Sequence, residues 1–351
     1  MPIRVLVVDD SAFMRKALSM MLGGDPEISV IATARDGVEA IEKVKTFKPD
    51  LMTLDVEMPR MDGITALKMI MKENPLPILM VSSLTIEGAK ATVDALSAGA
   101  VDFIPKQLSY VSLDITKIKD ELISKVKLIA RSRCRYLSSE PLKGSRSYRT
   151  SNTRLPGAQI VTVGISTGGP FSLQKVIPFL RQDFPVPVAI VQHMPPHFTK
   201  SLAERLDAIS QVKVFEAQDG MELDKGKVFI APGGLHMKFA RDGSRNIITT
   251  PKEPQDSLHR PSVDVMFTSA YENYGGRILA LIMTGMGKDG LEGAKLIKSA
   301  GGKLIAQNEE TCVIYGMPKA VVDAELADAV LPLEDIATAL NTAFVAAPVP
   351  A

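Results

Sequence analysis

The stretch QIVTVGISTGGP, residues 159–170, joins a β-branched apolar run directly to a turn of glycine and serine. A short apolar run of this kind is typical of a buried strand, and a glycine-rich turn at its end commonly leads into a helix. Further apolar runs follow it, separated by segments with helical spacing. Strands that alternate with helices predict an α/β domain with a largely parallel sheet. These runs are VPVAIVQHM, KVFIAPGG, RILALIMTG and KLIAQ.

The first third of the chain has the same alternation. Its apolar runs are IRVLVVDD, ISVIATA, LMTLD, PILMVSS and DFIPK, and helical segments such as GVEAIEKVKTF lie between them. Five strands that alternate with helices predict another doubly wound parallel sheet. A last helix, with Ile118, Leu122, Val126 and Ile129 at helical spacing, closes this unit.

A basic segment separates the two α/β units. Residues 131–154 contain seven arginines and lysines, six serines and one acid, Glu140. Like charges and few apolar residues leave this segment little to pack, which is typical of a linker. We therefore expect a first domain over residues 1–125, a helix end and linker over residues 126–156, and a second domain over residues 157–345.

Composition excludes several functional classes. The 351 residues are 46% hydrophobic and carry a formal net charge of +1, so we expect no nucleic-acid partner. The N-terminal MPIRVLVVDD reaches two aspartates before a signal-like segment could form, and no run approaches the length of a membrane span. Cys134 and Cys312 match neither a zinc spacing nor a redox pair. We expect a cytoplasmic monomer that is not inserted in a membrane.

Acidic side chains end two of the strands expected in the first domain. Asp9 and Asp10 end the first strand and Asp55 ends the third, and the carboxyl ends of parallel strands share one edge of a sheet. Clustered carboxylates repel one another unless a pKa rises or a divalent cation with oxygen ligands binds, and Mg²⁺ fits best. Ser82 and Lys106 end the fourth and fifth strands. This set of groups suits a phosphoryl group; the alternative is that each acid merely caps a helix.

Gly164, Ser166 and Gly168 fit the pattern G-x-S-x-G, which holds a nucleophilic serine on a strained turn between strand and helix. The alternative is a small-residue turn that allows close packing, and no Gly-Lys-Ser/Thr follows to favour a phosphate loop. A nucleophilic serine needs a base, and His193 follows directly on the next strand. His193 and His197 have a zinc-like spacing, but two intervening prolines disfavour a regular helix there.

A third residue must orient the imidazole, and Asp289 lies just after another apolar strand. Histidine can accept the serine proton near neutral pH, while a carboxylate fixes its tautomer and stabilises the imidazolium. A packed turn, a core histidine and a helix cap would explain the three residues separately. Their shared place at strand ends favours a Ser166, His193, Asp289 triad. The order Ser, His, Asp differs from that of α/β-hydrolases, so membership of that fold does not follow.

The first domain resembles the receiver domain of two-component response regulators, through VLVVDDSAFMR, LDVEMPRMDG, PILMVSS and AGAVDFIPK. The resemblance implies that Asp55 accepts a phosphoryl group from a histidine kinase. It implies Mg²⁺ held by Asp10, Asp55 and the backbone carbonyl of Glu57, with Asp9 just outside the ligand set. Lys106 would pair with the phosphoryl oxygens. Ser82 would be the switch hydroxyl, and Phe103 would lie on the face that responds to phosphorylation.

The second domain resembles the catalytic domain of chemotaxis protein-glutamate methylesterases, through GISTGGP, QHMPPHFTKSLAERL, APGGLHM, HRPSVDVMF, TGMGKDG and YGMPKAV. The resemblance implies hydrolysis of glutamate methyl esters on methyl-accepting chemoreceptors, with release of methanol and with possible deamidation of receptor glutamines. We expect no cofactor in this domain. Backbone N–H groups at Thr167 or Met286 would bind the oxyanion. His259, Arg260 and Asp264 are candidates for substrate contacts; the alternative for them is a structural salt bridge or helix cap. His236 is expected in the core or just behind the site.

Two domains of these kinds predict regulation by phosphorylation. Phosphorylated Asp55 would draw Ser82 and Lys106 inward and reshape the face around Phe103, which we expect to cover the catalytic strand ends at rest. One rival is a response regulator whose second domain only binds partners; another is a hydrolase of unrelated small esters. A DNA-binding output domain is disfavoured, since no helix-turn-helix with a basic recognition helix is evident.

Overall fold

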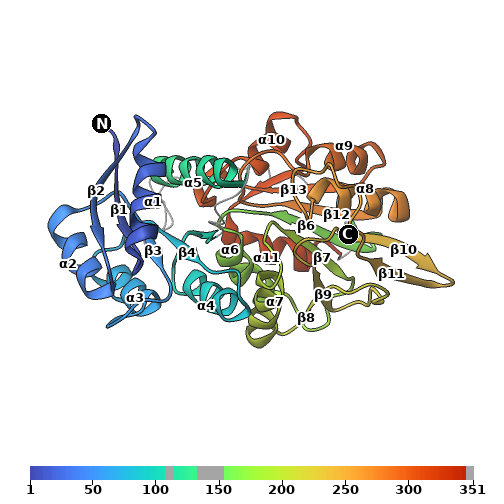
Figure 1. Ribbon diagram of the computed structural model, residues 1–351. Helices are drawn as coiled ribbons and strands as arrows, with labels where there is room; N and C mark the ends of the chain where they lie inside the picture. The colour runs from blue at the N-terminus through green and yellow to red at the C-terminus, as the bar shows by residue number, and fades with distance from the viewer. Residues whose placement is uncertain (107–113, 133–153, 345–351) are drawn as a thin grey trace. The chain divides into compact units, whose positions relative to one another are not determined.

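A computed structural model describes residues 1–106, 114–132 and 154–344, with backbone only at 114–117. The chain divides into two compact units, Met1–Glu140 and Pro141–Ala351, which follow one another from blue to red in Figure 1. The predicted linker lies mostly outside the described residues and stays a prediction. Among the described helices, none is both long and apolar enough to cross a bilayer.

The first unit is a five-stranded parallel sheet of order β2-β1-β3-β4-β5, with helices on both faces. Side chains of Ser11, Asp36, Asp62 and Thr85 each accept a backbone N–H at the start of one of the first four helices, which fixes where those helices begin. Helices α1 and α5 cover one face, and α2, α3 and α4 the other (Figure 1). The strands are β1 Ile3–Val8, β2 Ile28–Ala34, β3 Leu51–Asp55, β4 Ile78–Ser82 and β5 Asp102–Pro105; the helices are α1 Ala12–Gly23, α2 Gly37–Phe47, α3 Gly63–Glu73, α4 Ile86–Ser97 and α5 Asp114–Arg131.

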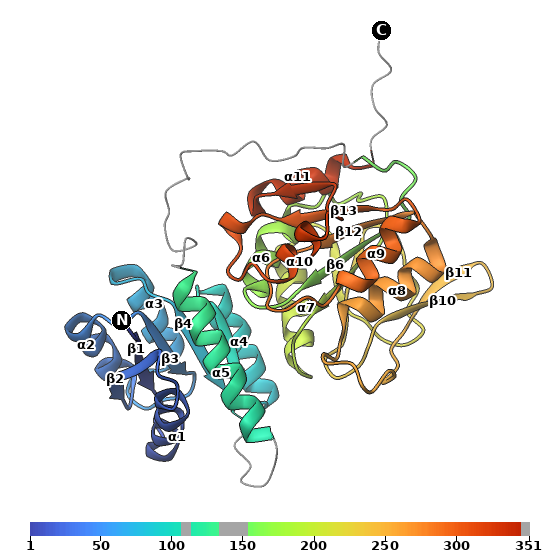
Figure 2. The same cartoon turned by 90° about the horizontal axis from the view of Figure 1, so that it is seen from above.

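The second unit is a seven-stranded parallel sheet of order β14-β13-β12-β6-β7-β9-β8. Helices α8, α9 and α10 lie on one face and α6, α7 and α11 on the other, as Figures 1 and 2 show. The strands are β6 Ile160–Ile165, β7 Val188–Gln192, β8 Lys213–Glu216, β9 Lys227–Ile230, β12 Ile278–Ile282, β13 Lys303–Gln307 and β14 Ala329–Leu331; the helices are α6 Gly169–Val176, α7 Phe198–Ile209, α8 Val263–Tyr274, α9 Leu291–Ser299, α10 Met317–Asp323 and α11 Leu333–Thr342.

An antiparallel hairpin, β10 Lys238–Asp242 and β11 Arg245–Thr249, stands apart from this sheet and extends beside α8 (Figure 2). The sequence analysis predicted β6, β7, β9, β12 and β13 of this sheet but neither the hairpin nor the edge strands β8 and β14. The prediction of two doubly wound parallel sheets is confirmed. Every residue of β6 and β12 is buried, which explains their continuous apolar runs.

Both sheets have a switch point where the chain reverses its direction of growth. β1 lies between β2 and β3, and β6 lies between β7 and β12. Ligands of such sheets bind beyond the carboxyl ends of the strands at these points, because the connecting helices leave on opposite faces and open a crevice. The two switch points are the ends of β1 and β3, where Asp9, Asp10 and Asp55 lie, and the ends of β6 and β12, which Ser166 and Asp289 follow. Ser82, Lys106 and His193 lie at the ends of the neighbouring strands β4, β5 and β7.

Candidate functional site

Ser166 follows the last residue of β6 and is partly exposed. Its backbone N–H donates to the carbonyl of Thr284 (3.0 Å), which fixes the turn to the segment after β12. Gly168 has φ +77°, a conformation that favours glycine. A Cβ on Gly164 would lie 2.4 Å from Cγ1 of Val263, so Gly164 allows close packing of β6 and α8. The turn therefore has the close packing that one interpretation expected, and the nucleophilic role of Ser166 stays a prediction.

His193 follows the last residue of β7, beside Ser166. Ile165 and Gln192 are paired in register, and the N–H of His193 continues the ladder to the carbonyl of Ile165 (3.2 Å). Ser166 and His193 are thus the next residues along two paired strands, which lie about 4.8 Å apart in a sheet. The His193 side chain is 9% exposed. The structure places the predicted nucleophile and base at adjacent strand ends.

Asp289, the third residue of the predicted triad, contacts His193. Nε2 of His193 lies 2.8 Å from Oδ2 of Asp289. This bond puts the proton of the neutral imidazole on Nε2 and leaves Nδ1 as the basic atom. Nδ1 is buried, and no hydrogen-bond partner for it occurs among the described residues.

The Asp289 carboxylate lies at the N-terminus of α8. Oδ2 accepts the N–H of Val263 (2.7 Å), and Oδ1 accepts the N–H of Asp264 and the hydroxyl of Ser262, each at 3.0 Å. Burial acts to raise the pKa of Asp289. The hydrogen bond and charge of His193, together with the two backbone N–H groups, act in the opposite direction and outweigh burial, so the pKa of Asp289 lies well below its usual value. Asp289 therefore stays ionised and can stabilise an imidazolium at His193.

His259 stacks on the imidazole of His193, with ring centroids 4.1 Å apart and planes 19° from parallel. Burial, with a smaller effect of His193, lowers the pKa of His259 to about 4, so it is neutral near pH 7. His236 is fully buried and its Nε2 lies 3.0 Å from the carbonyl oxygen of Pro254, which agrees with the core position expected for it. Arg260 donates to the carbonyl of Gln255 (3.1 Å), and Asp264 accepts the N–H of Gly293 (2.8 Å).

Two backbone N–H groups near Ser166 are available to an oxyanion. Within the described chain, neither the N–H of Thr167 nor that of Met286 has a protein acceptor. Gly285 brings the two peptides together, because a Cβ on Gly285 would lie 2.8 Å from the Cβ of Ser166. Neither assignment as oxyanion donor is tested by this geometry, and both stay predictions.

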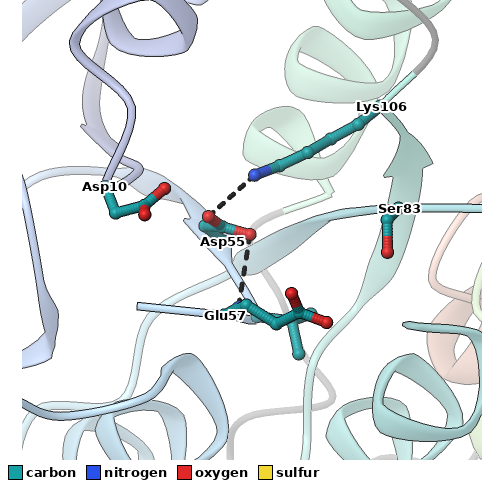
Figure 3. Close-up of a pocket in the computed structure, with 6 residues that line it drawn as sticks. Asp10, Asp55, Glu57, Ser83 and Lys106 are labelled. Atoms are coloured by element: carbon teal, nitrogen blue, oxygen red, sulfur yellow. Dashed lines mark hydrogen bonds and ion pairs between the residues drawn. The ribbon is translucent and has the colours of Figure 1, made fainter. Parts of the chain in front are cut away.

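The first unit gathers its acids beyond β1 and β3. One carboxylate oxygen from each of Asp9, Asp10 and Asp55 lies within 4.8 Å of the others. Asp9 and Asp55 are buried and Asp10 is exposed. A cavity of about 140 Å³ opens here; Figure 3 labels Asp10, Asp55, Glu57, Ser83 and Lys106 around it. Three carboxylates this close fit a hard divalent cation with oxygen ligands.

Lys106 is the cation of this cluster. Its Nζ lies 2.7 Å from Oδ2 of Asp55 and 3.0 Å from Oδ2 of Asp9. Burial raises the pKa of Asp55 to about 6; Lys106 opposes the rise and the charge of Asp9 adds to it. Burial likewise raises the pKa of Asp9. One lysine thus leaves the carboxylates only partly compensated, which favours binding of a further cation.

Of the predicted switch residues, Lys106 contacts the acids, whereas Ser82 and Phe103 do not line the cavity. The hydroxyl of Ser82 accepts from Thr92 (2.6 Å) and lies 3.2 Å from the carbonyl of Gly88, both in α4, so it does not line the cavity. Ser83, which the sequence analysis did not single out, lines it instead (Figure 3). Phe103 is 5% exposed, and its carbonyl accepts from Lys125 (3.0 Å). The switch roles of Ser82 and Phe103 stay predictions.

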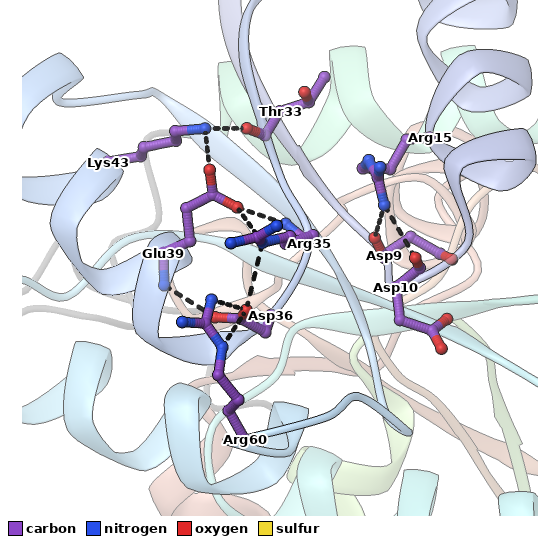
Figure 4. Close-up of polar contacts among 9 residues, drawn as sticks. All are labelled: Asp9, Asp10, Arg15, Thr33, Arg35, Asp36, Glu39, Lys43 and Arg60. Atoms are coloured by element: carbon purple, nitrogen blue, oxygen red, sulfur yellow. Dashed lines mark hydrogen bonds and ion pairs between the residues drawn. The ribbon is translucent and has the colours of Figure 1, made fainter.

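Two arginines that the sequence analysis also missed fix the loops around the acids (Figure 4). Arg15 in α1 donates to the backbone carbonyls of Asp9 (2.8 Å) and Asp10 (2.9 Å). Arg60, in the loop after β3, pairs through Nε with Asp36 (2.8 Å). Their partners are distant or backbone groups, so no local sequence pattern identifies them.

Comparison with known proteins assigns this arrangement to a family. The model of the CheB methylesterase family matches residues 161–340, and the model of the response regulator receiver domain matches residues 5–115. The chain belongs to the CheB methylesterase family. The resemblance that the sequence motifs suggested is confirmed.

Relatives match over nearly the whole chain. The protein-glutamate methylesterase/protein-glutamine glutaminase 1 of Oleidesulfovibrio alaskensis is 50% identical over 97% of this chain and 99% of its own. The corresponding protein of Pyrococcus abyssi is 46% identical over 95% of this chain and 91% of its own. The crystal structure of the Thermotoga maritima CheB methylesterase catalytic domain is 46% identical, covers 52% of this chain and 97% of that one, and superposes with a TM-score of 0.51.

Proposed function

We propose that this protein hydrolyses γ-glutamyl methyl esters on methyl-accepting chemoreceptors, releases methanol, and is activated by phosphorylation at Asp55. The observation that supports the proposal is the 2.8 Å contact between His193 and Asp289, at a strand end that is paired with the strand leading into Ser166, in a chain of this family. Relatives named as glutaminases support a second reaction, deamidation of receptor glutamines at the same serine. Such an enzyme would act in the cytoplasm, as expected from the sequence.

The proposed reaction proceeds through an acyl-enzyme. Ser166 Oγ attacks the ester carbonyl while its proton passes to Nδ1 of His193; the resulting imidazolium is stabilised by Asp289 through Nε2. The tetrahedral intermediate collapses, the bond to the methoxy oxygen breaks, and His193 returns the proton to form methanol. Water then attacks the acyl-enzyme in the same way and releases the glutamate carboxylate. The N–H groups of Thr167 and Met286 would bind the oxyanion in both steps.

In the receiver unit, an oxygen of Asp55 would accept the phosphoryl group as the bond to the kinase histidine breaks. Asp10, Asp55 and the Glu57 carbonyl would hold Mg²⁺, which supplies charge compensation for the phosphoryl oxygens when it is bound. Lys106 would move from the free carboxylates to the phosphoryl oxygens. The hydroxyl of Ser82 would leave Thr92 and turn inward, which requires it to break the 2.6 Å hydrogen bond described above.

Methanol release from methylated receptor membranes tests the proposal. The wild type and Ser166→Ala are compared, each with and without a small-molecule phosphodonor, and ammonia release from receptors with glutamine at the same positions reports deamidation. We expect a phosphodonor-dependent rate for the wild type and none above background for Ser166→Ala.

Three outcomes would contradict the proposal. Full activity of Ser166→Ala would mean that the serine is not the nucleophile. A wild type without esterase activity that still binds receptors would favour a binding-only output domain. Equal rates on receptor esters and on unrelated small methyl esters would favour a general esterase.

A further inference from the structure

Gln192 holds the backbone of both the proposed nucleophile and the proposed base. It is the last residue of β7 and is 2% exposed. Its Nε2 donates to the carbonyl of Ser166 (3.0 Å) and lies 3.3 Å from the carbonyl of His193. A buried side-chain amide that bridges two backbone carbonyls is costly to lose, because both carbonyls then lose a partner.

The bond to Ser166 also determines where the next N–H points. The peptide between Ser166 and Thr167 is not among the cis bonds of the described chain, so its C=O and N–H point in opposite directions. The Ser166 carbonyl is held from one side by Gln192 and by the N–H of Gly169 (2.8 Å). The Thr167 N–H therefore points to the other side, where no protein acceptor occurs among the described residues.

We propose that Gln192 is a positioning residue that aims the Thr167 N–H at the oxyanion of the ester-hydrolysis intermediate. The inference rests on the proposed function and adds to it a residue that does not contact substrate. An oxyanion donor acts only when it is already aimed at the charge that develops in the transition state. Loss of the Gln192 amide would leave the Ser166 carbonyl with one hydrogen bond, from Gly169. The peptide between Ser166 and Thr167 could then rotate more easily away from its productive orientation.

The peptide that carries the other proposed donor, the N–H of Met286, is held differently from the peptide that carries the N–H of Thr167. The carbonyl of Gly285, which precedes the Met286 N–H, accepts two backbone N–H groups, from Gly316 (3.1 Å) and Met317 (2.9 Å). That peptide is fixed by main chain alone. The Ser166 carbonyl has one backbone partner, and Gln192 supplies the second.

Gly169 provides the space that the Gln192 amide occupies. A Cβ on Gly169 would lie 1.8 Å from Oε1 of Gln192, and 3.0 Å from the nearest atom of Ile165. The φ angle of Gly169 is not positive, so alanine fits its backbone. Gly169→Ala would therefore be accommodated by movement of the Gln192 amide, and it offers a route to the same defect without changing Gln192 itself.

Steady-state kinetics on the full-length protein, with methylated receptor membranes as substrate, test this role. Gln192→Met removes the donor and keeps the length of the side chain. Asn273→Leu is the matched control, since its Nδ2 also bridges two carbonyls, of Phe239 and Ser269 at 2.9 Å each, away from the site. We expect Gln192→Met and Gly169→Ala to lower kcat about 10- to 100-fold with KM within about twofold, less than the 10²- to 10³-fold of a removed donor. Asn273→Leu should keep kcat within about twofold.

An analogue of the tetrahedral intermediate distinguishes a misoriented oxyanion donor from a general loss of folded structure. A peptide with a trifluoromethyl ketone in place of the glutamyl ester forms an oxyanion with Ser166, and its inhibition constant should rise by the same factor as kcat falls. Unchanged kcat and inhibition constant in Gln192→Met would overturn the inference. If Gln192→Met does not fold, as judged by circular dichroism, Gly169→Ala decides in its place. Activity that survives Ser166→Ala would instead refute the proposed function.

Discussion

Asp289→Asn is the substitution for which the structure makes the sharpest prediction. Each carboxylate oxygen of Asp289 accepts one backbone N–H of α8, from Val263 at Oδ2 and from Asp264 at Oδ1. Asparagine has a single acceptor oxygen, so in either orientation its NH₂ group must face one of these donors. If the NH₂ takes the Oδ2 position, it also donates to Nε2 of His193. The imidazole proton is then moved to Nδ1, the atom that must accept the proton of Ser166.

The expected magnitudes follow from these contacts. One buried N–H without an acceptor costs about 1–3 kcal/mol of unfolding free energy. Both orientations also remove the negative charge opposite the imidazolium, and a hydrogen bond to a charged group contributes about 1.5–3 kcal/mol, or about 10- to 150-fold in rate. The orientation with the wrong tautomer loses base catalysis as well, worth about 10²- to 10⁴-fold. We expect kcat to fall about 10- to 150-fold in the orientation that keeps the tautomer, and about 10³- to 10⁶-fold in the other.

Methanol release under saturating receptor, together with thermal unfolding, measures both effects. Asp328→Asn is the control, because Asp328 in the same unit also accepts a backbone N–H, from Leu304 (2.8 Å), but has lysine partners and no contact with His193. It should lose stability and keep kcat. If Asp289→Asn unfolds at a lower temperature but retains kcat within about threefold, Asp289 serves only as a cap of α8 and the triad assignment is wrong.

Three further predictions follow from the same contacts. Gly164→Ala places a methyl 2.4 Å from Val263 and should cost about 1–3 kcal/mol of unfolding free energy, measured by urea denaturation; an unchanged midpoint would show that the packing yields. Burial lowers the pKa of His259 to about 4, so between about pH 6.5 and 4 the unfolded chain binds the extra proton and stability should fall as pH falls, by at most about 1.4 kcal/mol per pH unit; His259→Phe should lack this slope, and identical slopes would contradict it. Asp55→Asn, or removal of divalent cations with EDTA, should abolish incorporation of label from a radioactive phosphodonor; label retained by Asp55→Asn would place the acceptor elsewhere.

The sequence allowed the fold and the chemical groups to be predicted because both depend on local pattern. Continuous apolar runs such as those of β6 and β12 identify buried parallel strands. Residues directly after such runs must lie at one edge of the sheet, which predicted that Ser166 and His193 end adjacent strands. Asp289, in the loop that follows β12, contacts His193 at the same edge. The short edge strands β8 and β14 were missed because three or four half-buried residues carry little periodic signal.

The atomic roles could not be predicted, because they depend on contacts between distant segments. No local pattern shows that Asp289 meets Nε2 of His193 rather than Nδ1. Gln192 ends an apolar strand, and no role for it could be predicted, because its partners are backbone carbonyls that carry no side-chain signature. The hydroxyl of Ser82 was expected beside the acids because Ser82 ends β4. In the structure it contacts Thr92 and Gly88 of α4 instead, and Ser82 does not line the cavity.

The two switch points differ in how they compensate buried negative charge. In the second unit, Asp289 is paired with His193 and lies against the N–H groups that begin α8, so its compensation is built into the backbone and its pKa is lowered. In the first unit, Asp9 and Asp55 share Lys106, and burial raises the pKa of both. A fixed compensation keeps a catalytic carboxylate ionised through every step of a cycle. An incomplete one leaves room for a cation and a phosphoryl group to change the local charge, which a switch requires.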